Sequence, residues 1–131
     1  MVAAHYQKAG EKMTGEHTDK FLAEAIESEY DHCVTKHGPF KNQHEAYGVL
    51  KEEMEEVQDA AELFNGRAMR NLDALWIKVK DDELTGADEN IKAIHDTAEE
   101  MAKECIQVMA VCRKWFDLIN EEQDADEKQA D

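Results

Sequence analysis

The sequence predicts an all-α domain, a four-helix bundle with two long antiparallel acidic helices and a short helix that connects them. Two observations predict this fold class. Apolar residues recur at alternating spacings of three and four over two long stretches, which is the pattern of amphipathic helices packed lengthwise. The 131 residues also include one proline, few aromatic residues and no sustained alternation of β-branched residues. A chain of this length can bury one real core.

The first predicted helix follows a polar lead-in. Residues 1–16 show no sustained period, so we expect a flexible N-terminal segment before a domain that spans residues 17–120. The helix starts near Thr18 and ends before Gly38 and Pro39, because glycine commonly caps a helix and proline cannot continue one. Its apolar face consists of Phe21, Leu22, Ala25, Ile26, Tyr30, Cys33 and Val34.

The second predicted helix covers residues 42–65, with Gly66 as its C-cap. Its apolar stripe consists of Tyr47, Leu50, Met54, Val57, Ala61 and Phe64. At about 100° per residue, Glu53 and Glu56 fall on one shoulder of this stripe, and Glu52 lies just behind Glu56. These carboxylates therefore border the core, whereas the other acidic residues of the helix spread over its solvent side.

A shorter connecting helix is predicted over residues 69–79, and Gly86 then breaks the chain before the last and longest helix. The connecting helix has Leu72, Leu75, Trp76 and Val79 at helical spacing. We expect the last helix to start near Asp88 and to end near Asn120. Its apolar stripe consists of Ile91, Ile94, Ala98, Met101, Cys105, Val108, Cys112, Trp115 and Ile119. Residues 121–131 lack such a stripe and are predicted to form a frayed or disordered acidic tail.

The last helix also has a polar shoulder beside its apolar stripe. It consists of the acids Glu100 and Glu104 and the amide Gln107. Antiparallel packing of the two stripes is expected to bring Glu53 and Glu56 near Glu100 and Glu104, so that about four carboxylates converge. Such a group cannot stay fully ionised without cations, and it either binds divalent metal or has sharply raised pKa values. Oxygen ligands favour the hard ions Mg²⁺ and Mn²⁺ over Zn²⁺.

Charge and hydropathy exclude other classes. A net charge of -16 argues against binding to a nucleic-acid duplex, which requires a basic surface. No stretch approaches the length of a membrane span, and the first residues lack a basic and apolar targeting pattern, so we expect a cytoplasmic protein without membrane contact. Cys105 and Cys112 lie two turns apart on one helix and cannot bridge each other, and with Cys33 they are expected to be buried free thiols.

Several segments between residues 18 and 119 form an ordered set of motifs. They are Lys36-His37-Gly38-Pro39-Phe40, His44-Glu45-Ala46-Tyr47-Gly48-Val49-Leu50 with the cluster Glu52, Glu53 and Glu56, Leu75-Trp76 before a charged segment, and Glu104-Cys105-Ile106-Gln107-Val108-Met109-Ala110. The set resembles the MazG-like branch of the all-α nucleoside triphosphate pyrophosphohydrolases, in the small form found in bacteria and their phages.

This resemblance implies a MazG-type fold and a metal-dependent enzyme that cleaves an (d)NTP between its α and β phosphates to a nucleoside monophosphate and pyrophosphate. In the family, an E-E-x-x-E motif on one helix and an E-x-x-D motif on the next hold Mg²⁺ ions that bind the triphosphate. Glu52, Glu53 and Glu56 match the first motif, and Glu104 matches the first acid of the second. The resemblance thus implies that Glu53 and Glu56 are catalytic. It also implies a homodimer or larger homo-oligomer, with the site beside a subunit interface.

The sequence departs from the family pattern at Gln107, where the family has an aspartate. An amide offers a metal only a neutral oxygen, which lowers the charge of the site by one. Glu100, one turn before Glu104 on the same shoulder, is the candidate that supplies the missing charge. The gap between Glu56 and Glu104 is also longer than in the family, as if the helix around Trp76 were inserted.

Two function classes stay open. The first is the Mg²⁺-dependent pyrophosphohydrolase. The second is a catalytically weak or inactive acidic helical module that binds a protein partner or a nucleotide without turnover. A di-iron bundle is excluded, because Glu29-x-x-His32 lacks the second E-x-x-H that such a centre requires. The residues that contact phosphate also stay open among Arg67, Arg70, Lys78, Lys80 and Arg113.

Overall fold

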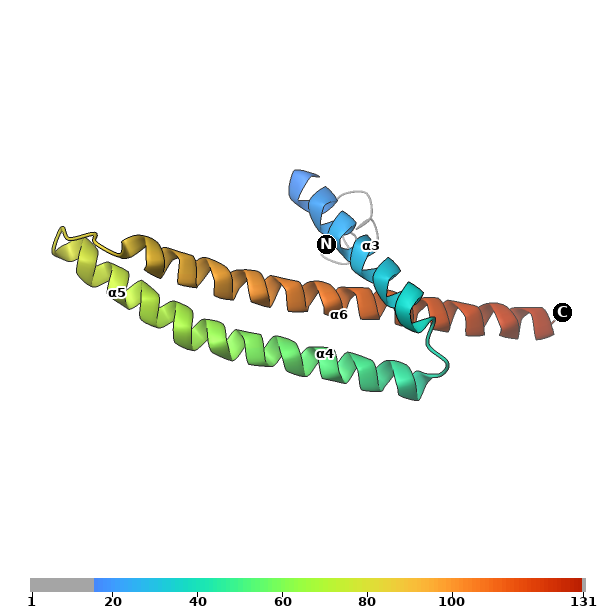
Figure 1. Ribbon diagram of the computed structural model, residues 1–131. Helices are drawn as coiled ribbons and strands as arrows, with labels where there is room; N and C mark the ends of the chain where they lie inside the picture. The colour runs from blue at the N-terminus through green and yellow to red at the C-terminus, as the bar shows by residue number, and fades with distance from the viewer. Residues whose placement is uncertain (1–15, 131) are drawn as a thin grey trace, which may run out of the picture.

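The computed structural model describes residues 16–130, which contain helices and no strand. The elements are α3 (Glu16–His37), α4 (Gln43–Leu63), the π-helical η1 (Phe64–Ala68), α5 (Met69–Lys80) and α6 (Ala87–Ala130). Figure 1 shows α4 and α5 as one long rod, α6 returning beside that rod, and α3 lying across α6. The predicted all-α class is confirmed. Residues 1–15 of the predicted lead-in lie outside the described residues.

Local signals at the α3–α4 connection act as the sequence predicts. Gly38 has a φ of 73° and donates its N–H to the Val34 carbonyl at 2.8 Å, which ends α3 in a left-handed turn. Asn42 caps α4, because its side-chain oxygen accepts the Glu45 N–H at 2.9 Å. The Glu45 carboxylate in turn accepts the Lys41 N–H at 3.0 Å. These contacts close the connection between the two helices tightly.

The predicted break at Gly66 is wrong. Backbone angles at Leu63, Phe64, Ala68 and Met69 are all right-handed helical, and η1 joins α4 to α5 without interruption. Among the glycines that the structure describes, only Gly38 and Gly86 have a positive φ, so Gly66 does not form a left-handed cap. The short connecting helix is therefore the continuation of α4 through a π-helical turn, which adds one residue to the turn.

The end of α6 also differs from the expectation. The helix continues past Asn120 to Ala130, although its last ten residues carry no apolar stripe. The described side chains between Glu121 and Lys128 are all exposed. In Figure 1 this part of α6 projects beyond the other helices. Residues with good helix propensity extend the helix here. One tertiary contact helps at its start, where the Gln43 amide donates to Glu122 at 2.8 Å.

The core is small and lies where the α3–α4 connection meets α6. Phe40, Ala46, Val111 and Leu118 are buried together, and Val49, Leu50 and Trp115 pack against them. Further along the rod the seam with α6 is lined by small side chains, since Ala60 and Ala68 are buried there. Small residues let the two long helices approach closely, so that polar side chains on their shoulders come within reach of one another.

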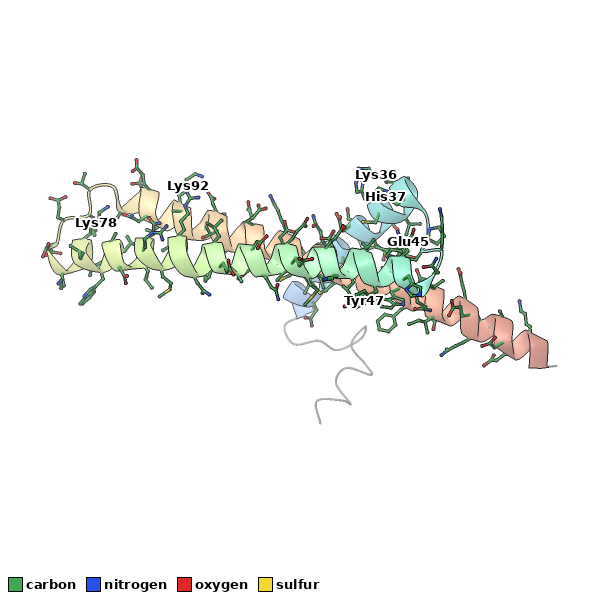
Figure 2. All side chains as sticks on the ribbon, turned by 90° about the horizontal axis from the view of Figure 1, so that it is seen from below. Lys36, His37, Glu45, Tyr47, Lys78 and Lys92 are labelled. Carbon is green, nitrogen blue, oxygen red and sulfur yellow. The ribbon has the colours of Figure 1, made fainter. Side chains whose placement is uncertain are left out.

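Helix α3 packs mainly against α6 rather than against α4. Tyr30 donates its hydroxyl proton to Asp117, and Arg113 pairs with Glu27 while its guanidinium lies 4.1 Å from the centre of the Tyr30 ring. In Figure 2, Lys36 and His37 lie on one side of α4, and Tyr47 points to the other. The face of α4 and α6 opposite α3 is therefore left uncovered by the described residues.

Helical spacing of the apolar residues Leu72, Leu75, Trp76 and Val79 is typical of a buried face, but three of the four are exposed in α5. Leu72, Trp76 and Val79 are 51%, 60% and 55% exposed, and only Leu75 is partly buried. Between the rod and α6, the Lys78 ammonium donates a hydrogen bond to the Asn90 side chain, and the Asn90 amide donates one to the Asn71 side chain at 2.8 Å. We name Leu72, Trp76 and Val79 the α5 stripe. A polar layer thus joins α5 to α6, while the α5 stripe faces outward.

No helix among the described residues is long and apolar enough to cross a membrane.

The helical backbone at Gly66 and the left-handed backbone at Gly86 predict opposite effects of substitution by alanine. Gly66→Ala should stabilise the protein by roughly 0.5–1 kcal/mol, because alanine has the higher helix propensity. The new Cβ would meet only the far end of the Arg70 side chain, at 3.4 Å. Gly86→Ala should destabilise it by about 1–2 kcal/mol, because its φ of 78° is left-handed. Urea unfolding followed by circular dichroism measures both. If Gly66→Ala destabilised the protein, the result would contradict the continuous helix and support a helix end at Gly66.

Candidate metal centre

Three carboxylates converge where α4 packs on α6. Glu53 and Glu56 lie one turn apart on α4, and Glu104 reaches them from α6. One oxygen atom from each of the three side chains lies within 4.8 Å of the other two. We name these three residues the carboxylate cluster. The sequence pattern predicts this convergence, and the close approach of the two helices produces it.

The carboxylate cluster is electrostatically unfavourable as it stands. Burial, the negative charge of Glu56, a hydrogen bond with Glu56 and the charge of Glu104 together raise the pKa of Glu53 to about 7, and burial has the largest effect. Burial also raises the pKa of Glu104, followed by its hydrogen bond with Glu56. Among the side chains that the structure describes, no basic residue forms an ion pair with these three. The carboxylate cluster therefore binds protons more readily than separate glutamates do.

Gln107 of α6 lies beside the carboxylate cluster. In the amide orientation that satisfies its neighbours, it donates to Glu53 Oε2 at 2.9 Å and to Glu104 Oε2 at 3.1 Å. The same side chain presents a carbonyl oxygen when its amide is turned by half a rotation. Gln107 can thus stabilise two carboxylates without a cation, or offer a neutral ligand to one.

The remaining predicted ligands flank the carboxylate cluster. Glu100 is exposed and raises the pKa of Glu104 by its charge, and it lines a shallow cavity with Glu56 and Glu104. Glu52 is also exposed and faces the cavity on the opposite side of Glu53, toward α3. Neither contributes an oxygen to the group that meets within 4.8 Å. The structure thus divides the predicted ligand set into a central group and two flanking acids.

The donor set suits a hard divalent cation. Mg²⁺ binds oxygen ligands at about 2.0–2.1 Å, so ligands on opposite sides of the ion lie about 4.2 Å apart. The mutual distances in the carboxylate cluster need only small side-chain movements to reach this value. Carboxylate and amide oxygens are the ligands of Mg²⁺ and Mn²⁺, and the three cysteines are not in this group.

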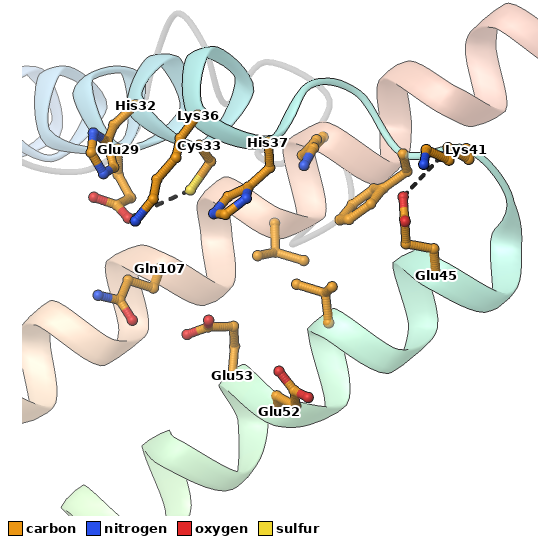
Figure 3. A pocket seen from close by; sticks show the side chains of 14 residues that line it. Glu29, His32, Cys33, Lys36, His37, Lys41, Glu45, Glu52, Glu53 and Gln107 are labelled. Carbon is orange, nitrogen blue, oxygen red and sulfur yellow. Dashed lines mark hydrogen bonds between the residues drawn. The ribbon is translucent and has the colours of Figure 1, made fainter.

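A cavity of about 550 Å³ opens beside the carboxylate cluster, between α3, α4 and α6. Figure 3 shows His32, Lys36 and His37 of α3 along one wall, with Glu52 and Glu53 of α4 facing them. Glu53 belongs both to this cavity and to the carboxylate cluster. The volume lies in the range of small-molecule sites. A ligand in the cavity would therefore reach the carboxylates directly.

Sequence reasoning missed the basic residues of this cavity. They are Lys36, His37 and His32 of α3, Lys41 of the connection and Lys114 of α6. None of the five basic residues first considered for phosphate lines it, and Arg113 pairs instead with Glu27. A signal existed for Lys114, which follows Gln107 by seven residues and so shares its face of α6.

The chain was also compared with known proteins. No family model, curated protein or solved structure matches it.

The raised pKa of Glu53 predicts a stability that depends on pH. The pKa of Glu53 is about 7 in the folded protein, against an ordinary glutamate pKa of 4.5, so over this range the folded state keeps a proton that the unfolded chain loses. Without metal, stability should thus fall as pH rises from about 4.5 to about 7, by about 1 kcal/mol after allowance for solvent screening, and then level off. Glu53→Gln should abolish most of this dependence and stabilise the protein at pH 8. Thermal unfolding at several pH values measures both.

The control for this experiment is Glu55→Gln on the exposed side of α4, which removes the same charge outside the carboxylate cluster. It should leave the dependence of the wild type in place. Equal pH profiles for the wild type and Glu53→Gln would show that the three carboxylates do not interact in solution.

Proposed function

We propose that the protein is a metal-dependent nucleotide pyrophosphohydrolase of the MazG-like type, which hydrolyses an (d)NTP to a nucleoside monophosphate and pyrophosphate. One observation carries the proposal: the carboxylate cluster of Glu53, Glu56 and Glu104 borders a cavity whose other walls carry basic side chains. Acids for a cation and bases for an anion, side by side, suit a metal-bound polyphosphate.

Each residue has a role in this proposal. The carboxylate cluster, with the Gln107 carbonyl oxygen, holds Mg²⁺ or Mn²⁺, which when bound neutralises phosphate oxygens and acidifies the attacking water. Water oxygen attacks the α phosphorus, the bond from that phosphorus to the oxygen bridging toward the β phosphorus breaks, and pyrophosphate leaves. Glu53 faces the cavity, and its carboxylate is the acceptor for the proton of the water. Glu52 and Glu100 add negative charge on either side and attract the cation.

We further propose that two copies of the chain complete a four-helix bundle. The rod of α4 and α5 and the returning α6 form a two-helix layer, of which α3 covers one side of one end. Exposed large apolar side chains support a second copy: Tyr47 and Met54 on α4, and the α5 stripe. Burial of apolar surface contributes about 25 cal/mol of free energy per Å², which favours such pairing.

A pyrophosphate-release assay tests the activity. With Mg²⁺ or Mn²⁺ and a panel of NTPs and dNTPs, the wild type should release pyrophosphate, and chelation of the metal should stop it. Glu53→Gln should lower kcat/KM by at least about 10²-fold, because it removes both a metal ligand and the proton acceptor. Glu55→Gln, with the same change of charge on the exposed side of α4, should keep full activity.

Two results of that assay would decide against the enzyme. If nucleotides and metal raise the melting temperature but no pyrophosphate appears, the chain is the binding module without turnover. If Glu53→Gln and Glu55→Gln retain equal activity, the reaction does not use the carboxylate cluster.

Light scattering on a sizing column tests the proposed pairing. The wild type should have at least twice the mass of the 15.0 kDa chain. Trp76→Glu should shift the protein toward the monomer, because it places a charge in the α5 stripe, where burial would desolvate it. Asn65→Glu is the matched control, since it adds the same charge at an exposed position outside that stripe. A monomeric wild type at all concentrations would contradict the pairing.

A further inference from the structure

One cation of the cavity is almost entirely buried. Lys114 is only 7% exposed, and its ammonium group lies 4.1 Å from the centre of the Phe40 ring. Phe40 and Lys114 both line the cavity beside the carboxylate cluster. The core residues Val111 and Leu118 flank Lys114 on α6, so the aliphatic stem is held within the core. Such packing directs the charged end to one place.

Lys114 has no counter-charge in the part of the chain that the structure describes. No carboxylate there forms an ion pair with it, and it takes part in no side-chain hydrogen bond. Its nitrogen is nevertheless not among the fully enclosed polar atoms without a partner, so the ammonium reaches open space. A cation taken out of water without a partner is unfavourable, and an anionic ligand would offset that cost.

The open space that the ammonium reaches is the cavity beside the carboxylate cluster. Lys114 also borders a second cavity between α3 and the C-terminal part of α6, where Asp117 and Asp124 lie, but it forms an ion pair with neither. Its ammonium group lies instead against the Phe40 ring, at 4.1 Å from the ring centre. Phe40 lines the first cavity and not the second. The contact with Phe40 therefore places the charge of Lys114 at the first cavity.

The basic side chains of the cavity come from α3, from the α3–α4 connection and from α6, and the acids Glu29 and Glu45 line it together with Glu52 and Glu53. In Figure 3, Lys36 and His37 extend from α3 into the space above Glu53 of α4, and Gln107 lies at its edge. Lys114 adds the buried cation from α6. A ligand with a metal at the α4 wall and phosphate oxygens at the α3 and α6 walls matches this arrangement.

We infer that Lys114 anchors a phosphate subsite in this cavity, which takes the part of a polyphosphate chain that extends away from the carboxylate cluster. Lys36 and His37 complete the subsite from α3. Its assignment to a substrate rests on the proposed function, whereas the binding of inorganic polyphosphate does not. Lys114 is a binding residue here, because its ammonium contacts the phosphate oxygens directly.

Calorimetric titration with inorganic triphosphate tests the subsite, in EDTA and again with Mg²⁺, at one fixed ionic strength. The wild type should bind triphosphate in both conditions. Lys114→Met keeps the stem on Phe40 and removes only the charge, so it should weaken binding at least tenfold. Lys114→Arg keeps a cation and should restore most of the affinity. Lys128→Met is the matched control, since it makes the same change at an exposed position of α6, and it should bind within twofold of the wild type.

Alkylation of cysteine locates the bound triphosphate independently of affinity. Triphosphate in EDTA should slow the reaction of Cys33 with iodoacetamide, and should leave Cys105 and Cys112 unchanged, because only Cys33 lines the cavity. Peptide mass spectrometry reads the three sites separately. Melting curves without ligand check that Lys114→Met is folded. If that variant does not fold, protection of Cys33 in the wild type and in Lys114→Arg carries the test.

Equal loss of affinity in Lys114→Met and Lys128→Met would overturn the subsite, because it would show an effect of net charge alone. Unprotected Cys33 at saturating triphosphate would also overturn it. These outcomes differ from failure of the proposed function: a protein that binds triphosphate through Lys114, yet shows no metal binding at Glu53 and no pyrophosphate release, keeps the subsite and loses the enzyme.

Discussion

The packing of α4 on α6 forces Glu53, Glu56 and Glu104 together, and the other features of the site follow from this constraint. Small side chains such as Ala60 along the seam allow the approach, and the core around Phe40 and Val111 holds the helices at that separation. Each carboxylate would separate from the others in an unfolded chain. Folding therefore opposes their repulsion, and protons, the Gln107 amide or a cation must compensate it.

The same arrangement explains why the core is small. No large side chain of the described residues is fully buried, and many large apolar side chains are exposed. A two-helix layer can bury only one stripe of each helix, because among residues 16–130 only α3 covers part of the layer and the opposite face has no partner. The α5 stripe therefore lacks apolar contacts, which favours binding of another apolar surface. The carboxylate cluster lacks positive charge, which favours binding of a cation.

Periodicity and spacing predicted much of this molecule, since the stripes define the helices and the shoulders define where the acids meet. They did not reveal what covers each stripe: Trp76 has the spacing of a core residue but lies on an outer face. Gly66 shows a second limit, because a glycine favours a helix end only when tertiary packing does not continue the helix through it. The spacing of Lys114 from Gln107 puts the two residues on one face of α6, but spacing alone does not show that a lysine is buried beside a cavity. The role of Lys114 depends on Phe40 and on α3, which are distant in sequence.

The high negative charge of the chain is compatible with an anionic ligand because the charges are separated locally. The formal charge of -16 repels polyphosphate at long range, but this field is screened within about 8 Å at physiological ionic strength. A ligand inside the cavity would lie closer to the lining charges than this screening length. The buried ammonium of Lys114 also acts in a medium of lower dielectric constant than water. A divalent cation in the carboxylate cluster would reverse the remaining local repulsion. Metal and phosphate should then bind cooperatively, because each neutralises the charge that disfavours the other.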